Sequence, residues 1–349
     1  MKIAVYAIAK NEAQFVQRWF DSAKEADSLH ILDTGSSDNT VTLARDLGID
    51  VARWEISPWR FDKARNLSLD MVPEDTDLCI ALDMDEVLVE GWREYLEAAY
   101  ADGVTRPRYQ YTWSWVGSKP GLVYGGDKIH ARHGYFWKHP VHEVITPKNP
   151  EREVQGWYGL EIHHHPDSTK SRGQYLPLLE LAVSEDPEDD RNAHYLAREY
   201  FFAGRLDEAK AEFQRHLGLP SARWGAERAQ SYRFLYKIDG HHLWLERALD
   251  EDPGRRETLV DLAFYWYQHE NWTECLKAAT AALAIKERPL EYLTEAEAWG
   301  PLAHDLAGIA ASRLGYNHQA FYHGMEALKL NPYDDRLVTN LEHYKKAAA

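Results

Sequence analysis

The first hundred residues alternate between short apolar runs and amphipathic segments. Four apolar runs predict buried strands: 3–9, 28–33, 51–56 and 77–83. The segments between and after them predict helices: 12–26, 39–48, 63–72 and 90–101. Strands separated by helices pair in parallel through right-handed crossovers. The pattern therefore predicts an α/β domain built on a mostly parallel, Rossmann-like sheet.

From 104 to about 165 the pattern changes to aromatic residues that alternate with polar ones. This pattern predicts a second set of strands that completes the same domain. In open α/β sheets, ligands bind beyond the carboxyl ends of the strands. Asp33 and Asp83 each end a predicted strand and are the first candidates for a binding site.

The rest of the chain is helical and repeats itself. The segments 196–217, 262–283 and 309–328 share one layout of helix, turn and helix, and a degenerate copy is expected between 226 and 253. The first two copies are offset by 66 residues, close to twice the tetratricopeptide period of about 34 residues. We therefore predict two domains, an α/β domain over 1–170 and an all-α, tetratricopeptide-like domain over 171–349.

Composition narrows the possible partners and location. The net charge is −16 over 349 residues, which disfavours a nucleic-acid partner because duplex binding depends on neutralising phosphates. Cys79 and Cys275 indicate no disulfide framework or zinc site and are compatible with a reducing cytoplasm. No run approaches the roughly 20 apolar residues of a membrane span, so we expect a cytoplasmic protein without one.

The string "IALDMDEVLVEG" permits two chemistries. It fits the DxDx[TV] pattern of haloacid-dehalogenase-type phosphatases, in which Asp83 would be the nucleophile. It also fits a pair of carboxylates, Asp83 and Asp85, that holds a divalent cation on a sugar nucleotide. The phosphatase alternative places its nucleophile on the first strand and needs a later acidic pair. Here Asp83 is 83 residues into the chain, on the fourth predicted strand, and Ala131 stands where the second acid of "GGDKIHAR" is needed.

Four motifs in order resemble the inverting family 2 glycosyltransferases, most closely bacterial members joined to C-terminal tetratricopeptide repeats. They are Lys10–Asn11–Glu12, the turn Asp33–Asp38, the helix Ala64–Asn66, and the pair Asp83 and Asp85. The resemblance covers residues 1 to about 165 and implies a GT-A nucleotide-sugar-binding fold. Sugar-1-phosphate nucleotidyltransferases share a related fold, but no G-x-G-T-R loop follows the first strand.

The resemblance implies a set of binding residues. Asp33 would bind the base or ribose of the nucleotide, and Arg65 the base or diphosphate through its planar fork of donors. Asp83 and Asp85 would hold Mn²⁺ or Mg²⁺ on the diphosphate. Relatives carry a late histidine, matched best by His164 in "IHHHP", which would complete the metal shell.

Inversion needs a base that takes the acceptor's proton. Glu143 in "FWKHPVHEVI" is our candidate, at a position where repeat-linked relatives carry an acidic residue, and Asp127 is the alternative. Lys128 and Arg132 are candidates for binding the phosphates.

The resemblance implies metal-dependent, inverting transfer of a monosaccharide from a nucleoside-diphosphate sugar, with a UDP-sugar favoured by family habit. The acceptor would be a hydroxyl or thiol of a protein, peptide or glycan, and the repeat domain would bind that acceptor or a second copy of the chain. The alternative of a different class is a repeat-based adaptor with a degenerate transferase domain.

Overall fold

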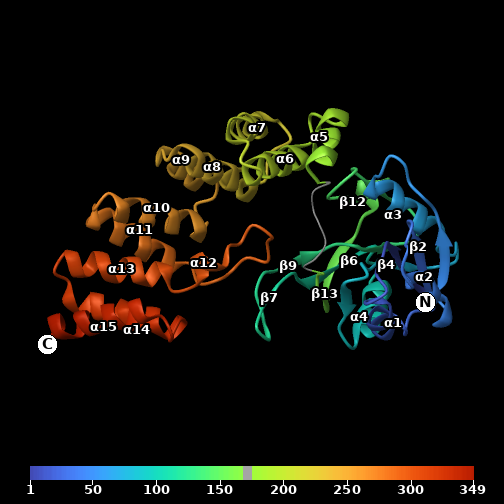
Figure 1. The fold of residues 1–349 in the computed structure, drawn as a ribbon, viewed down its shortest axis with the longest axis horizontal. Coiled ribbons are helices and arrows are strands. Elements are labelled where there is room, and N and C mark those ends of the chain that lie inside the picture. Colours follow the sequence, from blue (N-terminus) through green and yellow to red (C-terminus); the bar gives the residue numbers. More distant parts are fainter. Residues whose placement is uncertain (168–174) are drawn as a thin grey trace. The chain divides into compact units, whose positions relative to one another are not determined.

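A computed structural model describes residues 1–167 and 175–349. The chain divides into two compact units, which are described separately (Figure 1). The first comprises Met1–Ser184 and Leu290–Tyr292, and the second comprises Glu185–Pro289 and Leu293–Ala349. The predicted boundary between residues 170 and 171 lies outside the described residues.

The first unit alternates strands and helices in its first half and is mainly β in its second half. Its first elements are β1 (Ile3–Ala9), α1 (Val16–Ala23), β2 (Ser28–Asp33), α2 (Thr40–Asp46), β3 (Asp50–Arg53), α3 (Phe61–Asp70), β4 (Leu78–Ala81), β5 (Glu86–Leu88) and α4 (Trp92–Ala101). Its later elements are β6 (Arg106–Thr112), β7 (Trp115–Val116), β8 (Lys119–Pro120), β9 (Val123–Gly126), β10 (Ile129–Ala131), β11 (Tyr135–Lys138), β12 (Val144–Pro147), a 3₁₀ turn (Pro150–Arg152), β13 (Gln155–His164) and α5 (Tyr175–Glu185).

Two sheets organise this unit. The first has the order β10-β4-β1-β2-β3, with β4, β1, β2 and β3 parallel and β10 antiparallel to β4. The second has the order β5-β13-β6-β9 and is mixed, with β6 and β13 parallel. The predicted parallel sheet is thus present in the first half of the unit. The aromatic segment forms a separate mixed sheet and contributes only β10 to the first one.

Strand β1 lies at the centre of the first sheet and is apolar on both faces. Ile3 and Val5 belong to one core cluster, which includes Trp19 of α1. Tyr6 belongs to the cluster on the other face, which includes Trp137 of β11. A parallel strand covered on both sides reads as a continuous apolar run, which is why 3–9 shows no clear alternation.

The second unit is a helical region built from successive helical pairs. Its helices are α6 (Asp190–Phe202), α7 (Leu206–Gly218), α8 (Gly225–Asp239), α9 (Leu243–Glu251), α10 (Arg256–Gln268), α11 (Trp272–Ala284), α12 (Ala296–Trp299), α13 (Leu302–Arg313), α14 (Asn317–Leu330) and α15 (Asp335–Ala348). The three predicted helical pairs and the degenerate copy, α8 with α9, are confirmed. Equivalent turns take a left-handed residue at Gly204, Glu270 and Gly315, with φ of 75°, 53° and 79°.

Within residues 1–167 and 175–349, every helix is too short or too polar to cross a lipid bilayer. Both cysteines are buried thiols.

Candidate active site

Asp83 lies just beyond the carboxyl end of the parallel strand β4, and two cations hold its carboxylate. Its Oδ1 pairs with Nη2 of Arg65 at 2.5 Å, and its Oδ2 with Nζ of Lys128 at 2.8 Å. The Asp83 side chain is 33% exposed, whereas that of Arg65 is 5% exposed. Desolvation would raise the pKa of Asp83, but the attraction of Arg65 and Lys128 outweighs it, and the pKa is lowered. Asp83 is therefore an ionised carboxylate that remains accessible.

Glu86 is a buried member of the same cluster. It is 0% exposed, and both of its carboxylate oxygens accept from Nζ of Lys128, at 2.6 and 2.8 Å. It also accepts from the backbone N–H of Asp83 at 2.8 Å and from the hydroxyl of Tyr111 at 2.6 Å. Burial raises the pKa of Glu86, and the opposing attraction of Lys128 does not fully cancel this. Burial would lower the pKa of Lys128, but Asp83 and Glu86 raise it well above 10.5.

Arg65 joins the predicted base to this cluster. Its Nε donates to Oε1 of Glu143 at 2.9 Å, and its guanidinium lies over the ring of Trp137, 5.2 Å from the centroid. The structure therefore brings Glu143, Arg65 and Asp83 together, although they are far apart in the sequence. Glu143 precedes β12 and follows His142, whose φ of 50° is left-handed. The backbone at His142 is therefore not extended.

Asp85 and His164 face each other at the edge of the site. Nε2 of His164 lies 3.3 Å from Oδ2 of Asp85, and Nδ1 lies 2.9 Å from the carbonyl oxygen of Trp113. Since a carbonyl only accepts, Nδ1 carries the proton that it donates to Trp113. Nε2 then presents a lone pair to Asp85 when the imidazole is neutral and a proton when it is charged. A lone pair and a carboxylate oxygen need a proton or a cation between them. Burial would lower the pKa of His164, but Asp85 and the carbonyl of Trp113 outweigh it and raise the pKa.

The three predicted metal ligands do not converge on one point. Asp83 faces Arg65 and Lys128, whereas Asp85 faces His164. Among the described residues, three potential ligand side chains come together in the second unit, and that group contains none of these residues. At this site the geometry suits a cation between Asp85 and His164, with its remaining ligands supplied by a bound substrate or water.

Asp33 lies at the end of β2 as predicted, but its carboxylate accepts hydrogen bonds from the turn that follows it. It is 0% exposed and accepts from the backbone N–H groups of Gly35 at 3.3 Å and Ser36 at 3.2 Å. Arg53, whose side chain is 56% exposed, pairs with it at 3.3 Å. A ligand that reaches Asp33 has to displace this exposed guanidinium.

Arg132, a predicted site residue, does not lie beside the Asp83 cluster. Ala131 pairs with Leu78, so Arg132 adjoins the amino end of β4, opposite the end that carries Asp83. Its guanidinium donates to the carbonyl of Val72 at 3.1 Å and to Glu74 at 3.2 Å. The structure therefore does not bring Arg132 to the Asp83 cluster, because β10 runs antiparallel to β4 and carries Lys128 and Arg132 to opposite ends.

Asp127, the alternative base, also has another partner. Its Oδ2 accepts from Nη2 of Arg106 at 2.9 Å, and Arg106 in turn binds Glu153 at 3.0 Å. This leaves Glu143 as the candidate base that contacts the Asp83 cluster through Arg65.

Sequence reasoning missed Glu86 and Arg18. Glu86 directly follows Asp85. The sequence feature that could have identified it is a charged residue in the apolar string "EVL", which forms β5. Arg18 projects from α1, and its Nε and Nη2 have no hydrogen-bond partner among the described residues. Burial lowers the pKa of Arg18, and Asp85 acts in the opposite direction, so the two charges are neighbours.

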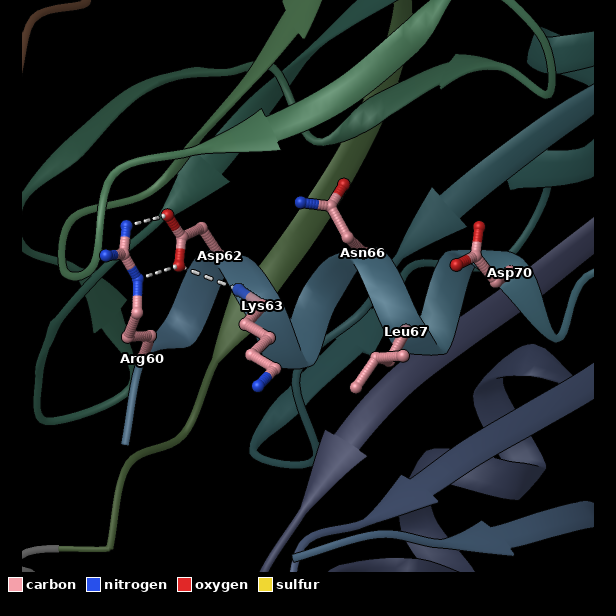
Figure 2. A pocket seen from close by; sticks show the side chains of 6 residues that line it. All are labelled: Arg60, Asp62, Lys63, Asn66, Leu67 and Asp70. Atoms are coloured by element: carbon pink, nitrogen blue, oxygen red, sulfur yellow. Dashed lines mark hydrogen bonds and ion pairs between the residues drawn. The ribbon is translucent and has the colours of Figure 1, made fainter. Parts of the chain in front are cut away.

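A shallow hollow runs along the other face of α3, the helix that carries Arg65. Figure 2 shows its lining residues: Arg60, Asp62, Lys63, Asn66, Leu67 and Asp70. Arg60 pairs with Asp62 at 2.8 Å, and Asn66 exchanges hydrogen bonds with the backbone of Trp137 at 2.8 and 2.9 Å. Because Arg60, Asp62 and Asn66 already have partners, we assign no binding function to the hollow. Asn66 of the "ARN" motif anchors β11 to α3.

No protein-family model and no curated protein sequence matches this chain. Among solved structures, a thermophilic tetratricopeptide protein of Thermus thermophilus is 18% identical over 50% of this chain and 91% of its own, with a TM-score of 0.32. MamA is 14% identical over 45% of this chain and 86% of its own, with a TM-score of 0.35. Glucosyl-3-phosphoglycerate synthase from Mycobacterium tuberculosis, with Mn²⁺, UDP-glucose and phosphoglyceric acid, is 23% identical over 32% of this chain and 44% of its own, with a TM-score of 0.27. These scores are too low to carry a functional argument.

Proposed function

We propose that the first unit is a metal-dependent, inverting glycosyltransferase that moves a monosaccharide from a nucleoside-diphosphate sugar to a hydroxyl or thiol. The observation that carries the proposal is the cluster beyond the carboxyl end of β4, where Asp83, Arg65, Lys128 and Glu143 meet. This is the end of a parallel sheet at which ligands bind. The order of motifs described above favours this chemistry, and a UDP-sugar is the expected donor.

The side chains suit an anionic donor held with a divalent cation. Nη1 of Arg65, and Nε and Nη2 of Arg18, have no hydrogen-bond partner among the described residues, so both guanidinium groups have donors left for phosphate oxygens. Asp85 and His164 would hold Mn²⁺ or Mg²⁺, because the Nε2 lone pair and the carboxylate oxygen already face one space. When bound, the metal would neutralise charge on the leaving diphosphate.

In the proposed transfer, residues of the chain would have separate roles. Lys128 and Arg65 keep Asp83 ionised and fix it near the donor. Glu143 would accept the proton of the acceptor hydroxyl or thiol as its oxygen or sulfur attacks the anomeric carbon. The bond from that carbon to the diphosphate oxygen breaks, and the diphosphate leaves with the bonding electrons. Attack from the face opposite the leaving group inverts the anomeric centre.

The first experiment is a thermal-shift screen of nucleotide sugars against the full chain, with and without Mn²⁺. At least one nucleotide should raise the melting temperature more with Mn²⁺ than without it, because a ligand that binds only the folded state stabilises it. Failure of every nucleotide would refute the proposal and favour the repeat-based adaptor. Vanadate-sensitive hydrolysis of a phosphomonoester, abolished by Asp83→Asn, would favour the phosphatase.

A second experiment tests the base. Glu143→Gln should abolish transfer but leave donor binding intact. Glu153→Gln is the matched control, because Glu153 also pairs with a buried arginine and has a similar side-chain exposure, 13% against 12%. Equal loss of donor binding and transfer in Glu143→Gln would instead make Glu143 a binding residue.

The second unit is proposed to bind the acceptor. Stacked helical pairs present extended surfaces that suit a protein or peptide, or a second copy of the chain.

A further inference from the structure

Three side chains from consecutive helices of the second unit converge far from the Asp83 cluster in sequence. They are Asp190 of α6, His216 of α7 and Glu227 of α8. Each offers one ligand atom, and these atoms all lie within 4.8 Å of one another. His216 is 0% exposed, Glu227 is 3% exposed and Asp190 is half-buried.

The repeat architecture explains why these residues meet. Asp190 lies in the first turn of α6, which Asp189 caps by accepting from the backbone N–H of Asn192 at 2.8 Å. His216 lies in the last turn of α7, and Glu227 lies in the first turn of α8. In an antiparallel helical array, the end of one helix adjoins the starts of the helices before and after it.

His216 is held with one ring nitrogen aimed into the group. Its Nδ1 lies 2.9 Å from the hydroxyl oxygen of Ser231, which also lies 2.8 Å from Nδ1 of His194. Nε2 of His216 is 3.4 Å from Oε1 of Glu227 and has no hydrogen-bond partner among the described residues. A serine has one proton, so it can donate to only one of the two imidazoles.

This hydrogen-bond chain defines two tautomeric arrangements. If Ser231 donates to His194, then Nδ1 of His216 donates to Ser231, and Nε2 of His216 has a lone pair. That lone pair faces two carboxylates, which is the donor set of a metal site with an oriented histidine. If Ser231 instead donates to His216, the proton on Nε2 meets Glu227 only at the long distance of 3.4 Å.

We propose that Asp190, His216 and Glu227 bind a divalent transition-metal ion, with Zn²⁺ as the test ion. One imidazole nitrogen and two carboxylates suit zinc, and a water molecule can complete a tetrahedral shell. Two carboxylates and a neutral imidazole also balance the charge of a dication. Zinc ligands at about 2.0–2.2 Å lie about 3.4 Å from one another, so ligand atoms up to 4.8 Å apart have to close by up to about 1.4 Å. Asp190, at the half-buried edge, is the side chain with room to make that movement.

The ion would connect both helices of the first repeat, α6 and α7, with α8 of the degenerate copy. The proposed site contains no cysteine, so the lack of a zinc-type cysteine spacing in the sequence does not argue against it. The ligands lie 26 and 11 residues apart along the chain, and only the packing of the helices brings them together.

The test uses the full-length protein, stripped with a chelator and dialysed against Zn²⁺, with bound zinc measured by mass spectrometry. The wild type should retain one zinc equivalent that Asp85→Asn does not remove, since Asp85 lies in the candidate active site. Asp190→Asn and Glu227→Gln should each lower zinc affinity at least tenfold. The control is Asp207→Asn, which removes the equivalent first-turn aspartate of α7 without touching the group.

Circular dichroism establishes that each variant is folded. If Glu227→Gln does not fold, Asp190→Asn still tests the proposal, because Asp190 is only half-buried and its substitution disturbs the core less. Zinc binding that is unchanged in Asp190→Asn overturns the proposal. Loss of zinc in Asp85→Asn alone also overturns it, because the ion would then belong to the first unit. A wild-type protein that retains no zinc is the third contradicting result.

Discussion

Replacing Lys128 with methionine tests the electrostatics of the candidate active site. The substitution keeps a long apolar stem but removes the charge that both oxygens of the fully buried Glu86 accept from. Asp83 keeps Arg65 as a partner and is a third exposed, so it loses less than Glu86. The variant therefore leaves one buried carboxylate without its cation.

Two magnitudes bound the cost. Breaking a buried ion pair by removing one partner costs about 3–5 kcal/mol. Glu86 can instead take up a proton, which at pH 7 costs about 3.7 kcal/mol, or 1.36 kcal/mol for each unit between pH 7 and its unfolded pKa of about 4.3. The loss should therefore be about 3–4 kcal/mol at pH 7 and about 1 kcal/mol at pH 5. The sign follows because the native variant binds more protons than the unfolded chain, so its stability falls as pH rises.

Native-state amide hydrogen exchange of β1 and β4 at pH 5 and pH 7 measures this loss in the first unit alone, which suits a chain of two units. Adding Glu86→Gln to Lys128→Met should restore most of the stability at pH 7. The same loss at both pH values, or a loss below about 1 kcal/mol at both, would refute the reasoning.

Three further predictions follow. Asp85→Asn should lower the pKa of His164, measured by NMR titration, because Asp85 is the main group opposing burial there; the pair's stabilisation is present below about pH 6.5 and is lost as pH rises through the raised pKa. Burial lowers the pKa of His130 to about 4, so stability should rise with pH between about 4 and 6.5, by about 3 kcal/mol in all, as urea unfolding across that range can measure. Glu270→Gly should stabilise the second unit by about 1 kcal/mol in thermal unfolding, because Glu270 takes the left-handed conformation that Gly204 supplies in the equivalent turn.

Each of these predictions has a contradicting result. An unchanged His164 titration in Asp85→Asn would contradict the role assigned to Asp85. An NMR midpoint of His130 near 6.5 would contradict its neutral hydrogen-bond chain, in which Tyr6 donates to Nε2 at 2.7 Å and Nδ1 donates to the carbonyl of Ala131 at 2.8 Å. For the turn, Gly204→Ala is the control and should destabilise; equal stability of Glu270→Gly and the wild type would refute the strain argument.

The local pattern of the sequence was sufficient for the elements and their broad grouping. The parallel strands can be predicted from the sequence because β1, β2 and β4 are apolar runs separated by helices of amphipathic spacing. The helical pairs can be predicted from the sequence because the repeat places glycines, which favour a left-handed turn, at the equivalent positions Gly204 and Gly315. Both signals act over a few residues, and a linear pattern records such interactions directly.

The partners of each site residue were decided by the tertiary structure. The segment "GGDKIHAR" suggests that Lys128 and Arg132 act together, yet β10 runs antiparallel to β4 and sends them to opposite ends of the sheet. Glu86, next to the predicted pair, looked like an ordinary strand residue until Lys128 and Tyr111 were placed beside it.

The group of Asp190, His216 and Glu227 shows the same limit in the second unit. Each residue by itself is an ordinary polar position on an amphipathic helix, and no spacing rule connects all three. The charge balance of a buried group depends on what lies within a few ångströms of it, because electrostatic attraction in a poorly solvated interior is strong only at close range. The sequence by itself determined the elements, the repeats and the candidate carboxylates, whereas the pairing of charges was decided only by the folding of distant segments onto one another.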